Sequence, residues 1–78
     1  MTNLEKYTKV FCETLGITEE QTKGLQYQEV EAWDSVGHMT LVASLEDEFG
    51  ISLDTDDIID LSSFEKGQEI LTKYDVEF

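Results

Sequence analysis

The residues best placed to do chemistry are Asp34 and Ser35, which precede a stretch with a helical pattern of apolar residues. A serine at a helix N-terminus lies beside backbone N–H groups without helical partners, at the positive end of the helix dipole. Such a position favours an anion, so the hydroxyl can serve as an attachment point for a phosphate. Asp and Ser are also ordinary capping residues, and in that interpretation they only begin the helix.

A hydrolytic triad is an alternative, because His38 follows Ser35 by three residues and would lie near it on a helix. A triad also needs a carboxylate that orients the imidazole and an oxyanion hole beside the nucleophile, and the sequence shows neither. We therefore interpret His38 as a partly exposed helix residue and predict no catalytic residues.

Metal binding is the next possibility, because Asp54, Asp56 and Glu65 match three ligand positions of an EF-hand calcium loop. The match fails at Ile58, where the loop needs an oxygen ligand, and at Ile59, where its sharp turn needs glycine. One histidine and one cysteine are too few for a zinc site. The sequence therefore predicts no metal site.

Length and charge restrict the class of protein further. The 78 residues predict one domain, residues 1–78, with a net charge of -13. This charge argues against nucleic acid and anionic membranes, which are polyanions, and favours partners with basic patches. The single cysteine, Cys12, excludes an internal disulfide and suits a reducing cytoplasm, where we expect it to fill space on the first helix. No stretch has the pattern of a membrane span or a signal peptide.

The apolar spacing predicts an all-α fold, a small helical bundle of three longer helices and one short helix. Thr2 and Glu5 have capping-box spacing, and Gly16 ends the first helix. Its apolar face is predicted to comprise Leu4, Tyr7, Phe11 and Leu15. Residues Ile17 to Ala32 read mainly as a long loop with one helical turn after Thr18. The residues expected to pin this loop to the core are Leu25, Tyr27, Val30 and Trp33.

The remaining helices are predicted at Ser35 to Phe49, ended by Gly50, at Thr55 to Asp60, and after Ser62. Ser62 and Glu65 again have capping-box spacing. In the Ser35–Phe49 helix the buried stripe is predicted as Val36, Met39, Val42, Leu45 and Phe49, with Leu41 at its edge. The last helix is expected to pack through Phe64, Ile70, Leu71 and Tyr74.

The stretch from Asp34 to Leu61 resembles the acyl carrier protein family, whose hallmark is Asp-Ser-Leu ahead of a helix. The further residues at the family's spacings are Val36, Leu41, Val42, Leu45, Glu46, Glu48 and Phe49. The resemblance implies that Ser35 receives a covalent 4'-phosphopantetheine arm from coenzyme A, with Asp34 and Val36 completing the motif. It also implies that the arm carries acyl groups as thioesters and that the chain has no catalytic activity of its own.

The resemblance extends to partners and cargo. Partners would be a phosphopantetheinyl transferase and acyl-loading and acyl-consuming enzymes with basic patches, which would meet a monomeric carrier on an acidic face. That face would comprise Glu46, Asp47, Glu48, Asp56, Asp57 and Asp60. The acyl chain would shelter in a gap between helices lined by Val42, Leu45, Ile58 and Leu61.

Two features of this chain depart from the pattern of the housekeeping carriers, and both bear on the identity of the cargo. Carriers of primary fatty acid synthesis usually have acids two and five residues after the serine, where this chain has Gly37 and Thr40. Glycine after Ser-hydrophobe occurs in D-alanyl carriers, and Trp-Asp-Ser with Gly-His-Met resembles free-standing carriers of specialised pathways. We expect a discrete acyl carrier of a specialised lipid, sugar or secondary-metabolite pathway. The alternatives are an aminoacyl or peptidyl carrier, and a helical protein-interaction module in which Ser35 is only a cap.

Overall fold

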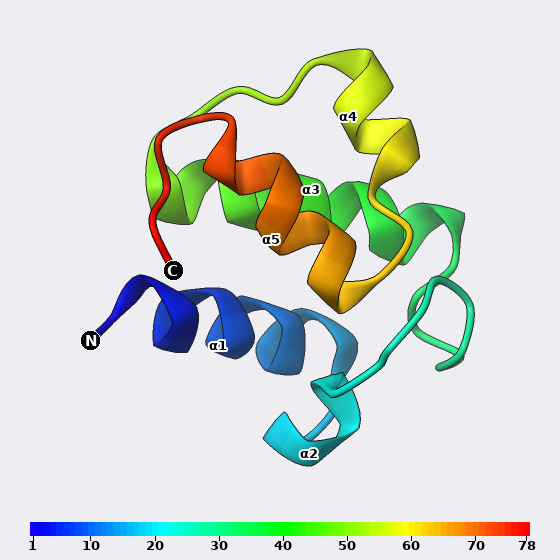
Figure 1. Cartoon of the computed structure of the whole chain (residues 1–78). Helices are drawn as coiled ribbons and strands as arrows, with labels where there is room; N and C mark the ends of the chain where they lie inside the picture. The colour runs from blue at the N-terminus through cyan, green and yellow to red at the C-terminus, as the bar shows by residue number, and fades with distance from the viewer.

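The computed structural model describes residues 1–78 and contains five helices and no strands (Figure 1). The helices are α1 (Asn3–Leu15), α2 (Glu19–Thr22), α3 (Ser35–Phe49), α4 (Thr55–Asp60) and α5 (Phe64–Thr72). The predicted all-α fold is confirmed, and α2 is the helical turn expected after Thr18. None of the five combines the length and the apolar character that crossing a membrane requires.

Local signals set most helix ends as predicted. The Thr2 side chain accepts the Glu5 backbone N–H, and the Glu5 carboxylate accepts the Thr2 N–H, which completes the capping box. Gly16 and Gly50 end α1 and α3 in the left-handed conformation, with φ of 66° and 63°. Glycine adopts this conformation without the steric strain of a Cβ, which is why these two positions stop the helices.

The start of α5 differs from the prediction by one residue. Its N-cap is Ser63, whose hydroxyl accepts the Lys66 N–H at 2.9 Å, so the Ser62–Glu65 capping box was wrong. The reason lies in the long loop, because the Ser62 carbonyl accepts the Tyr27 N–H at 2.8 Å. Ser62 is thereby held in extended backbone outside the helix.

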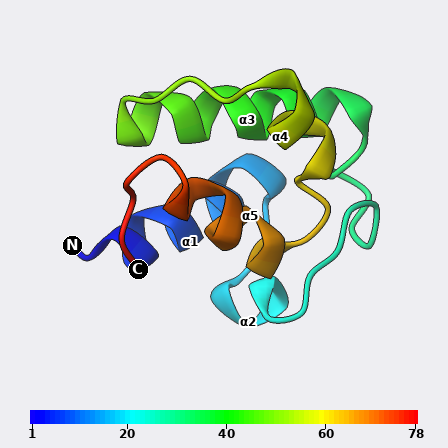
Figure 2. The ribbon, with the colours of Figure 1, turned by 45° about the horizontal axis from the view of Figure 1, so that its top comes forward.

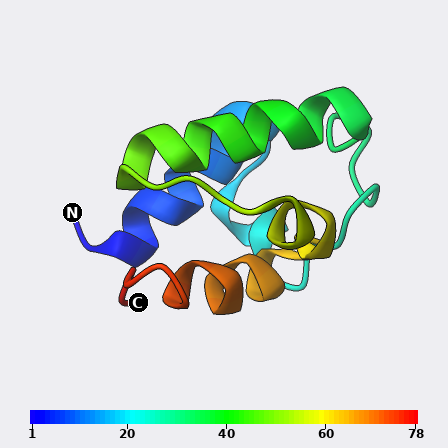
Figure 3. The ribbon, with the colours of Figure 1, turned by 90° about the horizontal axis from the view of Figure 1, so that it is seen from above.

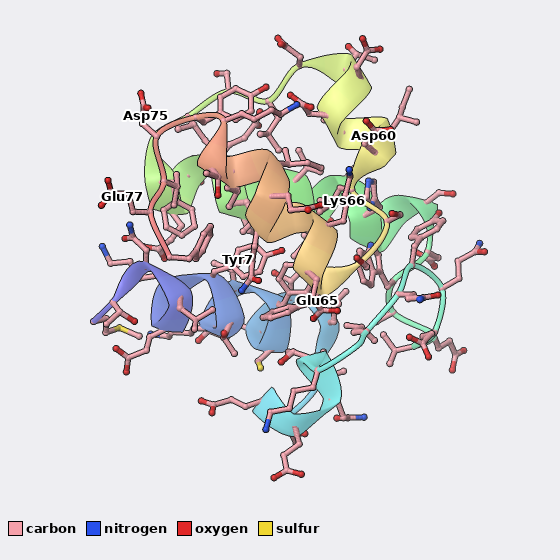
Figure 4. All side chains as sticks on the ribbon, viewed as in Figure 1. Tyr7, Asp60, Glu65, Lys66, Asp75 and Glu77 are labelled. Carbon is pink, nitrogen blue, oxygen red and sulfur yellow. The ribbon has the colours of Figure 1, made fainter.

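The core forms where α1, α3 and α5 meet. Figures 2 and 3 show α3 and α5 on opposite sides of the molecule, with α1 packed against α3. The buried apolar side chains are Tyr7, Val10, Phe11, Leu15, Leu25, Trp33, Leu41, Val42, Leu45, Leu53, Leu61, Phe64, Ile70, Leu71 and Val76. Tyr7 lies between α1 and α5, whereas Asp75 and Glu77 lie at the periphery (Figure 4). The Tyr7 hydroxyl donates to the Phe64 carbonyl at 2.6 Å, which satisfies a buried polar group.

The rotation of α3 about its axis was predicted wrongly. Val36 and Met39 are 76% and 55% exposed, and Leu41, expected at the edge, is fully buried. The face that meets the core is centred on Leu41, Val42 and Leu45, so both residues near the start of the helix face solvent. Similarly, Leu4 is exposed on α1, and Val10 is buried in its place.

The long loop is tied down at both ends of its course. Trp33 is fully buried and packs edge-on against Phe11, with ring centroids 5.5 Å apart, which confirms its prediction as a packing residue. Leu25 is buried, and its carbonyl accepts the Phe64 N–H at 2.8 Å. Gln26 forms an isolated bridge with Ser63. These contacts bring the loop back to the start of α3.

Candidate functional site

Ser35 is the first residue of α3 and is exposed. The Asp34 side chain caps the helix by accepting the Gly37 N–H at 2.8 Å, and the Asp34 carbonyl accepts the His38 N–H at 2.7 Å. The N–H groups of Ser35 and Val36 have no partner within the chain. A fifteen-residue helix therefore presents its positive end and two free donors beside an accessible hydroxyl, an arrangement that favours a phosphate group.

Gly37 has a steric role that the sequence did not reveal. A Cβ at this position would overlap the carbonyl oxygen of Ala32 and lie 3.1 Å from its carbonyl carbon. The loop therefore passes too close to the first turn of α3 for any side chain. This close approach gives a physical reason why this chain has no acid two residues after Ser35.

An apolar groove of about 360 Å³ opens beside Ser35, between the first turns of α3 and the segment that contains α4. Its lining consists of Tyr27, Ser35, His38, Met39, Ile58, Ile59, Leu61 and Ser62. None of these side chains carries a full negative charge at neutral pH, so the groove suits an apolar ligand better than a cationic one. The exposed side chains of Val36, Met39 and Ile59 extend this apolar surface around the serine.

His38 lines the groove and forms hydrogen bonds with the long loop and with α4. The Trp33 indole N–H donates to His38 Nδ1 at 2.9 Å, and His38 Nε2 lies 2.8 Å from the Ile58 carbonyl oxygen. The Trp33 and His38 rings are nearly coplanar, with an interplanar angle of 14° and centroids 6.2 Å apart, as an edge-to-edge hydrogen bond between them requires. His38 is half-buried, as expected for a partly exposed helix residue, but both of its ring nitrogens are engaged.

The residues expected to line an acyl gap divide into two groups. Ile58 and Leu61 line the groove beside Ser35. Val42 and Leu45 are instead 2% and 1% exposed within the core, and none of the surface hollows reaches them. The groove is therefore shallower than the predicted set implies, and its remaining walls come from Tyr27, Met39 and Ile59.

The acidic residues expected on a partner face also differ in exposure. The four that point to solvent are Asp47, Glu48, Asp56 and Asp60. Glu46 is half-buried, and its carboxylate accepts the Leu53 N–H at 2.8 Å, which fixes the loop after α3. Asp57 is only 6% exposed, so it is not free to pair with a partner's cation.

Asp57 instead joins α4 to the end of α5. Lys73 Nζ and the Tyr74 hydroxyl each donate to one of its carboxylate oxygens at 2.5 Å. These hydrogen bonds favour the charged carboxylate and lower the pKa of Asp57. The same hydrogen bonds raise the pKa of Lys73 and the pKa of Tyr74. The Asp57–Lys73 ion pair and the Tyr74 phenol therefore hold α4 against the end of α5.

Comparison with known proteins identifies the family of this protein. Residues 8–66 match the family model of the phosphopantetheine attachment site, and no curated protein matches the sequence. Because the match covers more than half of the chain, the protein belongs to this family of phosphopantetheine-carrying proteins. The family's prosthetic group is covalently attached 4'-phosphopantetheine, and its domains generally do no catalysis. The match sets aside the alternative of an interaction module without a carrier role.

The residues at the site fit this group. A phosphodiester on Ser35 would lie at the N-terminus of α3, where Ser35 and Val36 have free N–H donors. No hydrogen bond engages the Ser35 side chain, and the neighbouring groove is apolar. Sequence reasoning placed Asp34 and Ser35 at the start of a helix, as the structure does, but it did not reveal the close contact at Gly37 or the two hydrogen bonds of His38. A signal for His38 was present, because it precedes Leu41, Val42 and Leu45 by three, four and seven residues, the spacing of one helix face.

Proposed function

We propose that this chain is a discrete acyl carrier protein that holds its cargo on a 4'-phosphopantetheine arm attached to Ser35. The observation that carries the proposal is the exposed Ser35 hydroxyl at the N-terminus of α3, with two free N–H donors and an apolar groove beside it. When bound, the arm supplies a terminal thiol on which acyl groups are carried as thioesters. Asp34 fixes the first turn of α3, and Val36 offers an apolar contact beside the attachment point.

An acyl cargo is favoured over an aminoacyl cargo by the chemistry of the groove. An ammonium group needs a carboxylate or several acceptors when it leaves water, and no carboxylate lines this groove. An aliphatic chain gains about 0.8 kcal/mol for each methylene removed from water. Met39, Ile58 and Ile59 supply the apolar walls for such a chain.

We infer that partners approach along α3 and α4, both of which carry exposed carboxylates. A phosphopantetheinyl transferase and acyl-loading and acyl-consuming enzymes with basic patches would complement the charge of these helices. The carboxylates free to act there are Asp47, Glu48, Asp56 and Asp60. We propose that the carrier works as a monomer in the cytoplasm, in a specialised pathway of lipid, sugar or secondary-metabolite synthesis, without catalytic activity or a metal of its own.

Arm transfer tests the attachment site directly. The purified protein is incubated with coenzyme A and a broad-specificity phosphopantetheinyl transferase, and its intact mass is measured. One arm should add to the wild type and to Ser62→Ala, a matched control because Ser62 also lines the groove. Ser35→Ala should accept none and lose about 1 kcal/mol of stability or less. An arm mapped to Ser44, Ser62 or Ser63 would contradict the assignment.

A thiol assay and identification of the native cargo complete the test. Cys12 is the chain's own thiol, and burial raises its pKa, so the arm should appear as a second, faster-reacting thiol. Protein purified from its native host under conditions that preserve thioesters should carry an acyl group, identified by mass after release. An amino acid released instead would support the aminoacyl carrier.

A further inference from the structure

His38 is a polar residue on the face of α3 that meets the core. Its position continues the buried row formed by Leu41, Val42 and Leu45 toward the start of the helix. An imidazole in such a row must have its polar atoms satisfied, and both ring nitrogens of His38 are. The side chain therefore has a specific set of partners that an apolar residue in the same place would lack.

The hydrogen-bond partners determine the tautomer. An indole N–H can only donate, so the Nδ1 that receives it from Trp33 carries no proton. The proton of the neutral ring is then on Nε2, which donates it to the Ile58 carbonyl oxygen. His38 thus connects the long loop, α3 and α4 through one side chain.

The Ile58 carbonyl is near the C-terminal end of α4, where backbone carbonyls no longer have N–H partners within the helix. No backbone N–H of the residues after α4 donates to it, so His38 provides its partner. A six-residue helix is too short to be stable alone and depends on such contacts. Ile58, Ile59 and Leu61 form one wall of the groove, so the position of this end of α4 sets the groove's width.

We propose that His38, in its Nε2-protonated form, is a positioning residue that holds α4 at the distance from α3 at which the groove receives the acyl chain. This inference rests on the proposed carrier function and adds the residue that controls its cargo site. Trp33 acts with His38 by supplying the donor that fixes the tautomer. Without this pair, α4 would be held mainly by the contacts of Asp57 with Lys73 and Tyr74.

The proposal predicts a specific response to acid. Protonation puts a hydrogen on Nδ1, which then faces the indole N–H of Trp33, and two donors cannot bond to each other. The pH range to test is about 5–8. The other titratable groups on the surrounding segments are Lys23, Tyr27, Glu29 and Glu31 on the loop, Asp34 at the start of α3, Asp54 before α4, and the carboxylates of α4. Of these carboxylates, Asp57 is held by Lys73, and Asp56 and Asp60 point to solvent.

The first experiment uses the protein without its arm. Trp33 and His38 are the only tryptophan and histidine, so their NMR signals need no assignment. The ¹⁵N shifts of His38 should report the Nε2–H tautomer near neutral pH, and the Trp33 indole N–H signal should move when His38 is protonated. In His38→Gln, whose amide oxygen can accept from Trp33 and whose amide nitrogen can donate to Ile58, the Trp33 signal should not change with pH over this range. An Nδ1–H tautomer in the wild type would overturn the proposal.

The second experiment measures shelter of the cargo. The arm is installed with an acetyl or an octanoyl thioester. In each variant, the hydrolysis rate of the acetyl thioester divided by that of the octanoyl thioester measures how well the longer chain is sheltered. His38→Phe and Trp33→Phe keep a ring but lose the hydrogen bonds, and the ratio should fall roughly fivefold, the equilibrium equivalent of one hydrogen bond. His38→Gln should retain shelter. Val10→Ala, a core change away from the groove, should lower stability and leave the ratio unchanged.

The outcomes separate this inference from the carrier function. Failure of Ser35 to accept an arm would refute the carrier function itself. An arm on Ser35 with the same shelter ratio in His38→Phe as in the wild type would refute only the positioning role. Loss of shelter in His38→Gln equal to that in His38→Phe would also overturn it, because the amide would then not replace the two hydrogen bonds.

Discussion

Replacing Gly37 by alanine should destabilise the protein, although the same change in most helices stabilises. Alanine is favoured over glycine inside a helix by up to about 1 kcal/mol. At this position the new Cβ would overlap the Ala32 carbonyl oxygen, so the loop would have to move away. Relieving such an overlap by backbone shifts typically costs about 1–3 kcal/mol. Because the Cβ would lie far inside van der Waals contact of a backbone oxygen, we expect a cost in the upper part of this range, about 2–3 kcal/mol, and a net loss of about 1–2 kcal/mol.

Thermal unfolding measures this loss. For a domain of this size, 1 kcal/mol corresponds to a Tm change of about 4–8 °C, so Gly37→Ala should melt at least roughly 4 °C below the wild type. Thr40→Ala, an exposed position on the same helix, is the matched control and should melt within a few degrees of the wild type or slightly above it. Arm transfer should also slow in Gly37→Ala, because Ala32 lies two residues before the Asp34 cap. A Tm at or above that of the wild type would refute the steric argument.

Three further predictions concern charge. The pKa of Asp57 is lowered in the fold, so its stabilising contribution is present above its unfolded pKa of about 4 and is lost as pH falls through the lower folded pKa. The Tm difference between wild type and Asp57→Asn should therefore shrink toward zero in acid, and a constant difference would contradict this. Because the net charge is -13, the Tm should rise with added salt, and a steady fall would mean that attractive pairs dominate. Asp47→Lys combined with Asp56→Lys should slow arm transfer more than Glu20→Lys with Glu77→Lys, which changes the net charge equally; equal effects would exclude a specific acidic face.

Most helix ends were predictable because their causes are local; the start of α5, which depends on a contact of Ser62 with Tyr27, was not. A capping box requires residues three apart, and Gly16 and Gly50 stop their helices through their own backbone conformation. The position of Ser35 at the start of α3 was predictable for the same reason, since Asp34 and Ser35 define that start within two positions. These features depend on residues that are neighbours in the sequence.

The features that the sequence did not predict depend on distant contacts. Val36 and Met39 are as apolar as core residues, and only the packing of α1 and α5 against the other face of α3 leaves them exposed. Asp57 resembles its acidic neighbours, but Lys73 lies sixteen residues away and removes it from the surface. Nothing within α3 distinguishes Val36 and Met39 from core residues, and nothing within α4 distinguishes Asp57 from its acidic neighbours.

Predicting the groove from the sequence would have required knowledge of two sets of contacts between segments. Gly37 is needed because of a loop residue, and His38 is satisfied by Trp33 on one side and Ile58 on the other. Reading His38 as a member of the buried row would have placed it correctly on the helix. Its partners could not have been named, because they depend on how the loop and α4 are folded against α3.

The contact between the long loop and the start of α5 determines at what stage of its synthesis the protein could accept an arm. Gln26 bridges to Ser63, and the Leu25 carbonyl accepts the Phe64 N–H, so the loop before Ser35 is held by residues synthesised much later. Domains fold as units, and contacts between distant residues form slowly. A nascent chain that ends before Phe64 would present Ser35 on an unanchored segment. The transferase would therefore meet a formed site only on chains whose α5 has left the ribosome, and incomplete chains would escape modification.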